Sequence, residues 1–205
     1  MFYWKHALVI AASGVIAGCG TPFLHSASGN GPLIRDPGLA GEWTTTGATT
    51  THAVIHDPKD SAGGGGDGGP YVVALTVQHD GESKTSLTLD LTLTEIGGAR
   101  YADLFLGRAE RDRLVGTYGF LAVPVHQVIK ISRDGDELRV WSFNGSWLEG
   151  TAQGGMFSHD RITVGGGEVE MVTAPTDKVR ELIARHGNDG AAFAEPLVFR
   201  RYGGQ

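Results

Sequence analysis

The chain has 205 residues, of which 32 are glycine and 8 are proline. These two residue types make up about a fifth of the chain, compared with roughly an eighth in average proteins. Because each interior glycine costs a helix about 1 kcal/mol, the composition excludes a mainly helical fold. The formal net charge of −6 argues against a partner bound through its negative charge, such as a nucleic acid or an anionic membrane surface. The length fits one domain with a real hydrophobic core.

The N-terminus has the features of a secretory signal. Lys5 precedes the uncharged apolar run Ala7–Ala17, which is shorter than the roughly 20 residues that span a bilayer. The run ends with Ile-Ala-Gly-Cys at positions 16–19. This motif resembles the lipobox of bacterial lipoproteins, in which signal peptidase II cuts before a cysteine that receives a diacylglyceryl group. The resemblance implies a signal peptide at 1–18 and a lipid, such as palmitate, on Cys19.

Cys19 is the only cysteine of the chain, so neither an intrachain disulfide nor a cysteine-based metal site is possible. Two or more acyl chains on this residue would anchor the protein stably to a membrane. The next residue is Gly20 rather than the aspartate that retains enterobacterial lipoproteins in the inner membrane. This favours the outer membrane, facing the periplasm, in a Gram-negative organism. The alternative is an ordinary signal peptide with a chance cysteine.

Residues 19–37 contain many glycine, serine and proline residues and show little periodicity. This composition predicts a flexible tether, followed by a single domain at 38–205. A second glycine-rich stretch, at 57–70, is expected to be a long surface loop within that domain.

Apolar residues alternate with polar residues over several short segments, as is typical of strands with one buried face. The candidate strands outside hairpins are Glu42–Thr46, Thr50–His56, Tyr71–Val77, Glu168–Val172 and Leu197–Tyr202. The clearest alternation is in Leu87–Thr94, which is followed by Gly97 and Gly98. A two-residue turn at these glycines predicts a hairpin in which Leu91 lies opposite Leu104, Thr92 opposite Asp103 and Asp90 opposite Phe105.

A second hairpin is predicted around Asp134 and Gly135. With these two residues at the centre of the turn, the expected opposite pairs are Ile131 with Leu138, Ile129 with Val140, Val128 with Trp141, and His126 with Phe143.

One helix is predicted after these strands. Thr176 is a suitable N-cap, Gly187 is a suitable stop, and a stripe of apolar spacing lies between them at Val179, Leu182, Ile183 and His186. The order is therefore about eight short antiparallel strands, one helix and a last strand. An antiparallel barrel is expected, because closure removes exposed strand edges.

This order resembles the lipocalin-like, or calycin, barrel. Gly41-Glu42-Trp43 matches the Gly-x-Trp of that family near its first strand. The resemblance implies that a basic residue near the C-terminal end, Arg200 or Arg201, packs over the tryptophan. A looser likeness to uncharacterised bacterial lipoproteins rests on a sheet, the pair Trp147-Leu148, a helix and a final strand that begins at Pro196-Leu197. That likeness implies no activity.

Three residues are candidates for catalysis. Asp90 and Asp103 are diagonal neighbours in the predicted hairpin, where two carboxylates could serve as acid and base or bind a cation. The simpler alternative places both on the solvated outer face. His126 is the third candidate, with a hydrogen-bonded structural histidine as its alternative. His52 and His56 lie about 13 Å apart along a strand and cannot share one metal ion. No metal or cofactor is therefore expected.

A face formed by Phe120, Val128, Trp141 and Phe143 is the candidate binding surface, for a partner protein of the envelope or a lipid-like ligand. The alternative is that the predicted helix covers it. Asn144–Trp147 is interpreted as a turn that follows a strand, since it lacks the Gly-x-Ser-x-Gly pattern of a hydrolase nucleophile.

The leading hypothesis is a membrane-anchored envelope lipoprotein with a non-enzymatic binding or structural role. One alternative is an envelope hydrolase that uses Asp90 and Asp103, with His126. Another is a carrier of a small apolar or lipid ligand. The hydrolase needs the two carboxylates in a concave pocket, and the carrier needs an enclosed apolar cavity rather than a filled interior.

Overall fold

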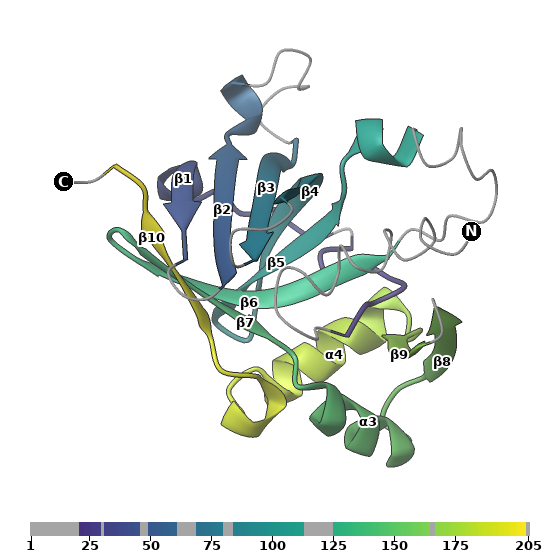
Figure 1. The fold of residues 1–205 in the computed structure, drawn as a ribbon. Helices are drawn as coiled ribbons and strands as arrows, with labels where there is room; N and C mark the ends of the chain where they lie inside the picture. The colour runs from purple at the N-terminus through teal and green to yellow at the C-terminus, as the bar shows by residue number, and fades with distance from the viewer. Residues whose placement is uncertain are drawn as a thin grey trace, which may run out of the picture.

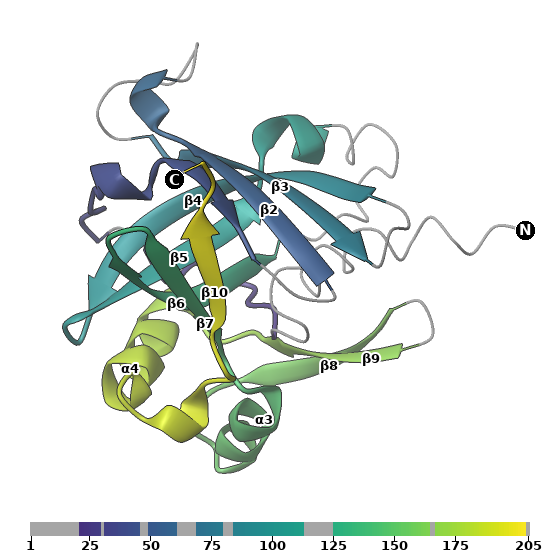
Figure 2. The ribbon, with the colours of Figure 1, turned by 60° about the vertical axis from the view of Figure 1, so that its left-hand side comes forward.

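The computed structural model describes residues 21–29, 31–45, 49–60, 69–79, 84–112, 125–164 and 167–203. Eight strands form a closed antiparallel barrel, which confirms the prediction of a mainly β, lipocalin-like fold. The chain winds in order from β1 to β7, and the last strand, β10, closes the barrel between β7 and β1 (Figures 1 and 2). The barrel strands are β1 (Gly41–Thr44), β2 (Thr49–His56), β3 (Tyr71–His79), β4 (Lys84–Ile96), β5 (Ala99–Leu106), β6 (His126–Asp134), β7 (Glu137–Ser142) and β10 (Leu197–Arg201).

The segment between β7 and β10 forms a second layer outside the barrel. It contains α3 (Gly145–Gln153), the hairpin of β8 (His159–Val164) and β9 (Gly167–Val172), α4 (Thr176–His186) and the 3-10 turn η5 (Gly190–Ala192). Figures 1 and 2 both show α3, α4 and the β8–β9 hairpin on the same side of the barrel. Two further 3-10 turns, η1 (Pro37–Leu39) and η2 (Pro58–Asp60), lie in the N-terminal part. No helix in the described ranges is long and apolar enough to span a bilayer.

The β4–β5 hairpin has the predicted register. Leu91 pairs with Leu104, and Thr92 pairs with Asp103. Gly97 and Gly98 form the turn with φ of +61° and +78°. Side chains other than glycine are strained at such angles, so these two residues define where the hairpin turns.

The predicted turn of the β6–β7 hairpin is wrong by one position. Asp134 pairs with Glu137, so the central residues of the turn are Gly135 and Asp136. Gly135 supplies the positive φ, at +56°, as the first of these two residues. Arg201 holds the second one in place, because its backbone N–H donates to the Asp136 carbonyl and its Nε lies 3.2 Å from Asp136 Oδ1.

This change moves every partner in the hairpin by two residues. The observed pairs include Ile131 with Val140, Ile129 with Ser142 and Lys130 with Trp141. Val128 therefore does not face Trp141, and His126 does not face Phe143, as the sequence had predicted. Because the shift is an even number, each side chain keeps its predicted face and the aliphatic residues remain inside the barrel.

The predicted late helix is present as α4, and its stripe of Val179, Leu182 and Ile183 is buried. Its N-cap is Pro175 rather than Thr176, and no side chain caps it.

The prediction of a single helix missed α3. Asn144 caps α3 through Oδ1, which accepts from the backbone N–H of Trp147 at 3.3 Å. The segment that was interpreted as a plain turn is therefore the start of a helix. Gly145 and Gly150 lie within α3, and glycine disfavours a helix, which explains why local propensity did not reveal it.

The segment before the barrel is packed rather than free. Phe23 and Ala27 are fully buried. Phe23 exchanges two backbone hydrogen bonds of 2.8 Å with His126, and the N–H of Leu24 donates to the Val172 carbonyl. The folded part thus includes described residues well ahead of the predicted boundary at residue 38. The physical reason is that Phe23 buries its ring between the barrel wall and the second layer.

At one end of the barrel, Trp43 is fully buried and its Nε1 donates to the Leu39 carbonyl at 2.9 Å. The Arg201 guanidinium lies 4.4 Å from the centre of the tryptophan ring. Arg201 also donates to the carbonyls of Gly38 and Ala40. This confirms the expectation of a basic residue over the tryptophan and selects Arg201. The contact ties η1 to the last strand and closes this end of the barrel.

Candidate functional site

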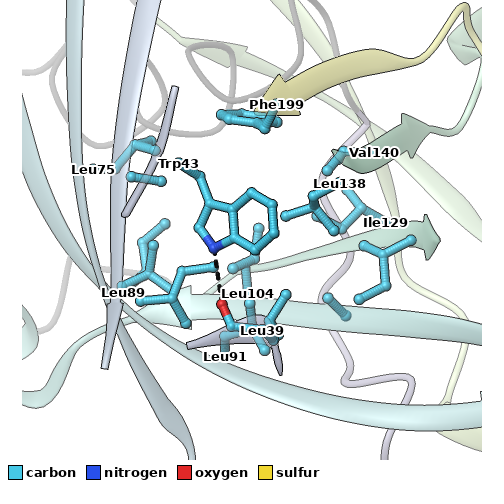
Figure 3. A pocket seen from close by; sticks show the side chains of 15 residues that line it. Leu39, Trp43, Leu75, Leu89, Leu91, Leu104, Ile129, Leu138, Val140 and Phe199 are labelled. Carbon is cyan, nitrogen blue, oxygen red and sulfur yellow. Dashed lines mark hydrogen bonds between the residues drawn. The ribbon is translucent and has the colours of Figure 1, made fainter. Parts of the chain in front are cut away.

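Side chains that point into the barrel line a small apolar cavity. Its volume is about 50 Å³, and a water-sized group needs roughly 10–15 Å³ on this measure. The cavity therefore has room for roughly three to five methylene-sized groups. Figure 3 shows its lining side chains around Trp43, with Phe199 above the tryptophan in this view. All the lining residues are apolar: Leu39, Trp43, Ala53, Ile55, Val73, Leu75, Leu89, Leu91, Ala102, Leu104, Ile129, Ile131, Leu138, Val140 and Phe199.

An ion-pair cluster around the buried carboxylate of Asp36, which we call the Asp36 plug, lies next to η1 at the same end of the barrel as Trp43. Asp36 Oδ2 lies 2.7 Å from Arg100 Nη1, and Asp36 Oδ1 lies 3.2 Å from Arg133 Nη2. The backbone N–H of Gly38 donates to Oδ1 at 3.0 Å, and the N–H of Asp36 donates to the Tyr71 hydroxyl at 2.9 Å.

The plug changes the pKa of its carboxyl group. Burial by itself raises the pKa of Asp36, but the hydrogen bond and charge of Arg133 oppose it. Together with the Gly38 N–H and the charge of Arg100, they hold the pKa below its usual value. Asp36 is thus an anion that its partners keep charged, and the plug stabilises the fold at neutral pH.

A second polar cluster, the Asp103 clamp, lies on the outer face of β5. Asp103 is only 3% exposed. Its Oδ1 lies 2.8 Å from Nδ1 of His126, and its Oδ2 accepts from the Ser26 hydroxyl and from the Ala27 N–H, the latter at 3.0 Å. Ser28 Oγ joins this cluster at 3.5 Å from Oδ2. The alternative of a solvated outer face is therefore wrong for Asp103, because residues 26–28 cover it.

Asp90 lies beside the clamp but has its own partner. Arg111 Nη1 lies 3.3 Å from Asp90 Oδ2, and the Arg111 guanidinium lies 4.5 Å from the Phe105 ring. Phe105 in turn stacks on His126 with ring centres 4.5 Å apart. Asp90 is therefore paired with Arg111, and Asp103 with His126. The stacked rings of Phe105 and His126 separate the two ion pairs.

Asp103 fixes the orientation and the tautomer of the His126 ring. A carboxylate only accepts hydrogen bonds, so the contact with Asp103 places the proton of His126 on Nδ1. Ser26 bonds to the carboxylate and not to the imidazole, whereas a nucleophilic serine needs its bond to the histidine. The arrangement therefore acts as a clamp that holds residues 26–28. The ranges that the structure describes contain no group of three metal-ligating side chains placed to hold a metal ion.

The candidate binding face is largely internal. Phe143 is 1% exposed, with its ring centre 5.7 Å from that of Phe23 and 4.9 Å from that of Phe193. Val128 and Phe143 belong to one buried cluster with the α4 residues Val179, Leu182 and Ile183. The alternative that the helix covers this face is thus confirmed for these residues.

The other two residues of the candidate binding face are Trp141 and Phe120. Trp141 is half-buried, and the Lys130 ammonium lies 6.0 Å from its ring centre. Phe120 lies outside the described residues, as does the proposed lipidation site Cys19.

Sequence reasoning missed one residue of the interior, Gln127. It is 5% exposed, and within the described ranges neither its Oε1 nor its Nε2 has a hydrogen-bond partner. The signal was present in the alternation of β6, because Ile129 and Ile131 point inward and Gln127 lies in step with them.

Comparisons with known proteins gave no match to a family model, to a curated protein or to a solved structure. The interpretation of the site therefore rests on the geometry of this chain.

Proposed function

We propose that this protein is a membrane-anchored envelope lipoprotein whose barrel binds a small apolar ligand. The observation that supports binding is the cavity, since all of its lining residues are apolar. An apolar group that enters such a cavity leaves water without displacing any polar contact, which favours binding by about 0.8 kcal/mol per methylene. The limited volume restricts the occupant to a small molecule or to the end of a longer apolar chain.

The anchor rests on the lipobox at residues 16–19. A lipid on Cys19 would hold the barrel close to the bilayer, because Phe23 is already buried in the folded part. Four residues span at most about 14 Å. The domain would thus lie against the membrane surface, within reach of ligands that partition there.

Binding in the barrel can be tested with a matched pair of substitutions. Ala102 lines the cavity, whereas Ala74 is exposed on the outer face of β3. Ala102→Val adds two methyl groups inside, and Ala74→Val adds the same two groups outside. We expect Ala102→Val to weaken binding of 1-chloropentane about tenfold, because it fills the space that the ligand needs. Ala74→Val is expected to bind like the wild type.

The measurement is an NMR titration of the wild type and both variants, which follows the methyl resonances of Leu104 and Ile129. Equal affinity in the two variants would place the ligand outside the barrel. The absence of any binding to the wild type would contradict the proposed function and leave a structural role. Native mass spectrometry of the protein purified from membranes would show which ligand accompanies it.

The anchor has a separate test. We expect mass spectrometry of the mature protein to find an acylated N-terminal Cys19. Cys19→Ser is expected to release the protein from the membrane fraction, because no acyl chain can then be attached. Ser13→Ala, which changes the apolar run but keeps the cysteine, is the control and should remain membrane-bound. A mature protein that starts at another residue without a lipid would contradict the anchor and leave barrel binding to be judged by its own test.

A further inference from the structure

The buried amide of Gln127 has no hydrogen-bond partner among the residues that the structure describes. The side chain is 5% exposed, and both of its polar atoms are buried without a hydrogen bond. Strand alternation directs it into the barrel, because Ile129 and Ile131 of the same strand line the cavity. Buried polar groups in proteins are nearly always hydrogen-bonded, so an unpaired amide in an interior position indicates a missing partner.

Gln127 is not one of the residues that line the cavity, but it lies next to two of them on β5 and β6. Its cross-strand partner is Leu104, and its neighbour on the same face is Ile129. Both of these residues line the cavity. Arg133, a member of the Asp36 plug, lies six residues further along β6, which corresponds to about 20 Å. The interior thus has a charged plug at one end, an apolar middle and a neutral amide towards the other end.

The chemistry of the amide defines what it can bind. A glutamine side chain both donates and accepts hydrogen bonds and carries no charge. None of the described residues that line the cavity is cationic, and Arg100 and Arg133 are engaged by Asp36. An ionised head group would be buried there without a counter-charge, which is strongly unfavourable. A neutral head group that can donate and accept would pair with the amide.

We infer that the ligand is a small uncharged amphiphile, whose head is a hydroxyl or carboxamide group bound by Gln127 and whose short apolar chain fills the cavity. This inference rests on the proposed function, because it assigns the polar end of the same ligand. The volume of the cavity limits the buried chain to roughly three to five carbons.

The experiment compares four five-carbon probes by NMR titration: 1-pentanol, pentanamide, 1-chloropentane and pentanoate at pH 8. In the wild type, 1-pentanol and pentanamide should shift the side-chain N–H₂ resonances of Gln127 and bind about tenfold more tightly than pentanoate. Gln127→Leu should weaken the binding of 1-pentanol and pentanamide about tenfold and leave 1-chloropentane bound at least as tightly.

A matched control is available in Gln153, an exposed glutamine of α3, whose change to leucine should alter none of the affinities. Thermal unfolding of both variants checks that the fold is intact. If Gln127→Leu binds 1-pentanol as tightly as the wild type does, the inference is wrong while the proposed function stands. Pentanoate that binds the wild type as tightly as 1-pentanol does would also overturn the inference. If the wild type binds none of the four probes, the proposed function itself fails.

Discussion

Asp103→Ala is expected to lower the free energy of unfolding by about 3–5 kcal/mol and to release residues 26–28 from the barrel wall. The carboxylate of Asp103 accepts from Ser26, from the Ala27 N–H and from His126. Alanine removes all of these bonds at once and leaves buried donors unpaired. The N-terminal segment then keeps only its other contacts, such as the 2.9 Å bond from Arg180 to the Ala27 carbonyl.

Urea unfolding measures the loss of stability, and amide hydrogen exchange at Ala27 reports the release of the segment. Asp90→Ala is the matched control, because Asp90 lies on the same face and its one described ion pair, with Arg111, is partly exposed. Its cost should stay near 0–1 kcal/mol. If the two variants are equally stable, or if Ala27 exchanges in Asp103→Ala as slowly as in the wild type, the clamp does not hold the segment. Asp103→Asn, which keeps the shape of the side chain, extends the test should the alanine variant fail to fold.

Asp36→Asn is expected to destabilise the protein by about 2–3 kcal/mol at pH 7, since it removes the anion between Arg100 and Arg133. The effect should depend on pH. The pKa of Asp36 is lowered in the folded state, so as the pH falls the unfolded chain takes up the proton first, at about 3.9. The stabilisation is therefore fully present above about pH 4 and is lost as the pH falls through the folded-state pKa.

The measurement is the free energy of unfolding of wild type and Asp36→Asn between pH 3 and pH 7. The difference between the two proteins should be largest at neutral pH and should shrink in acid. Asp134→Asn serves as the control, because Asp134 is exposed at the end of β6 and its change should have little effect at any pH. A wild-type advantage over Asp36→Asn that does not fall in acid would show that the carboxylate of the plug does not contribute as a charged group.

Local patterns were sufficient for the parts of the fold that depend on neighbours in sequence. Gly97 and Gly98 determine the β4–β5 register, because both central residues of this turn have a positive φ, which glycine adopts without strain. The stripe at Val179, Leu182 and Ile183 identified α4, because apolar residues at this spacing lie on one face of a helix.

The β6–β7 hairpin shows where such patterns stop. A turn centred on Asp134 and Gly135 and a turn centred on Gly135 and Asp136 both keep the aliphatic residues inside the barrel. The alternation of apolar and polar residues therefore cannot distinguish the two turns. In the observed turn, Asp136 accepts hydrogen bonds from Arg201. Arg201 belongs to β10, the last strand, so this contact is not visible in the local sequence of the hairpin.

The candidate site also has features that the sequence predicted and features that only the structure revealed. Sequence spacing placed Asp90 and Asp103 on one face of a hairpin, and the structure agrees. It could not reveal that Ser26 and Ala27 cover Asp103, because these residues lie more than 70 positions away and look like part of a spacer. Nor could it reveal that the amide of Gln127 lacks a partner, since that depends on every side chain around it.

By itself the sequence determined the β class of the fold, the late helix and the inward faces of the strands. These follow from local periodicity and turn chemistry. The tertiary structure decided that the barrel interior holds a small apolar cavity, that residues 21–29 belong to the folded part, and that the Gln127 amide lacks a hydrogen-bond partner in the described part of the chain. Each of these depends on how well distant side chains fill space and satisfy hydrogen bonds, a property of packing in three dimensions that no local pattern encodes.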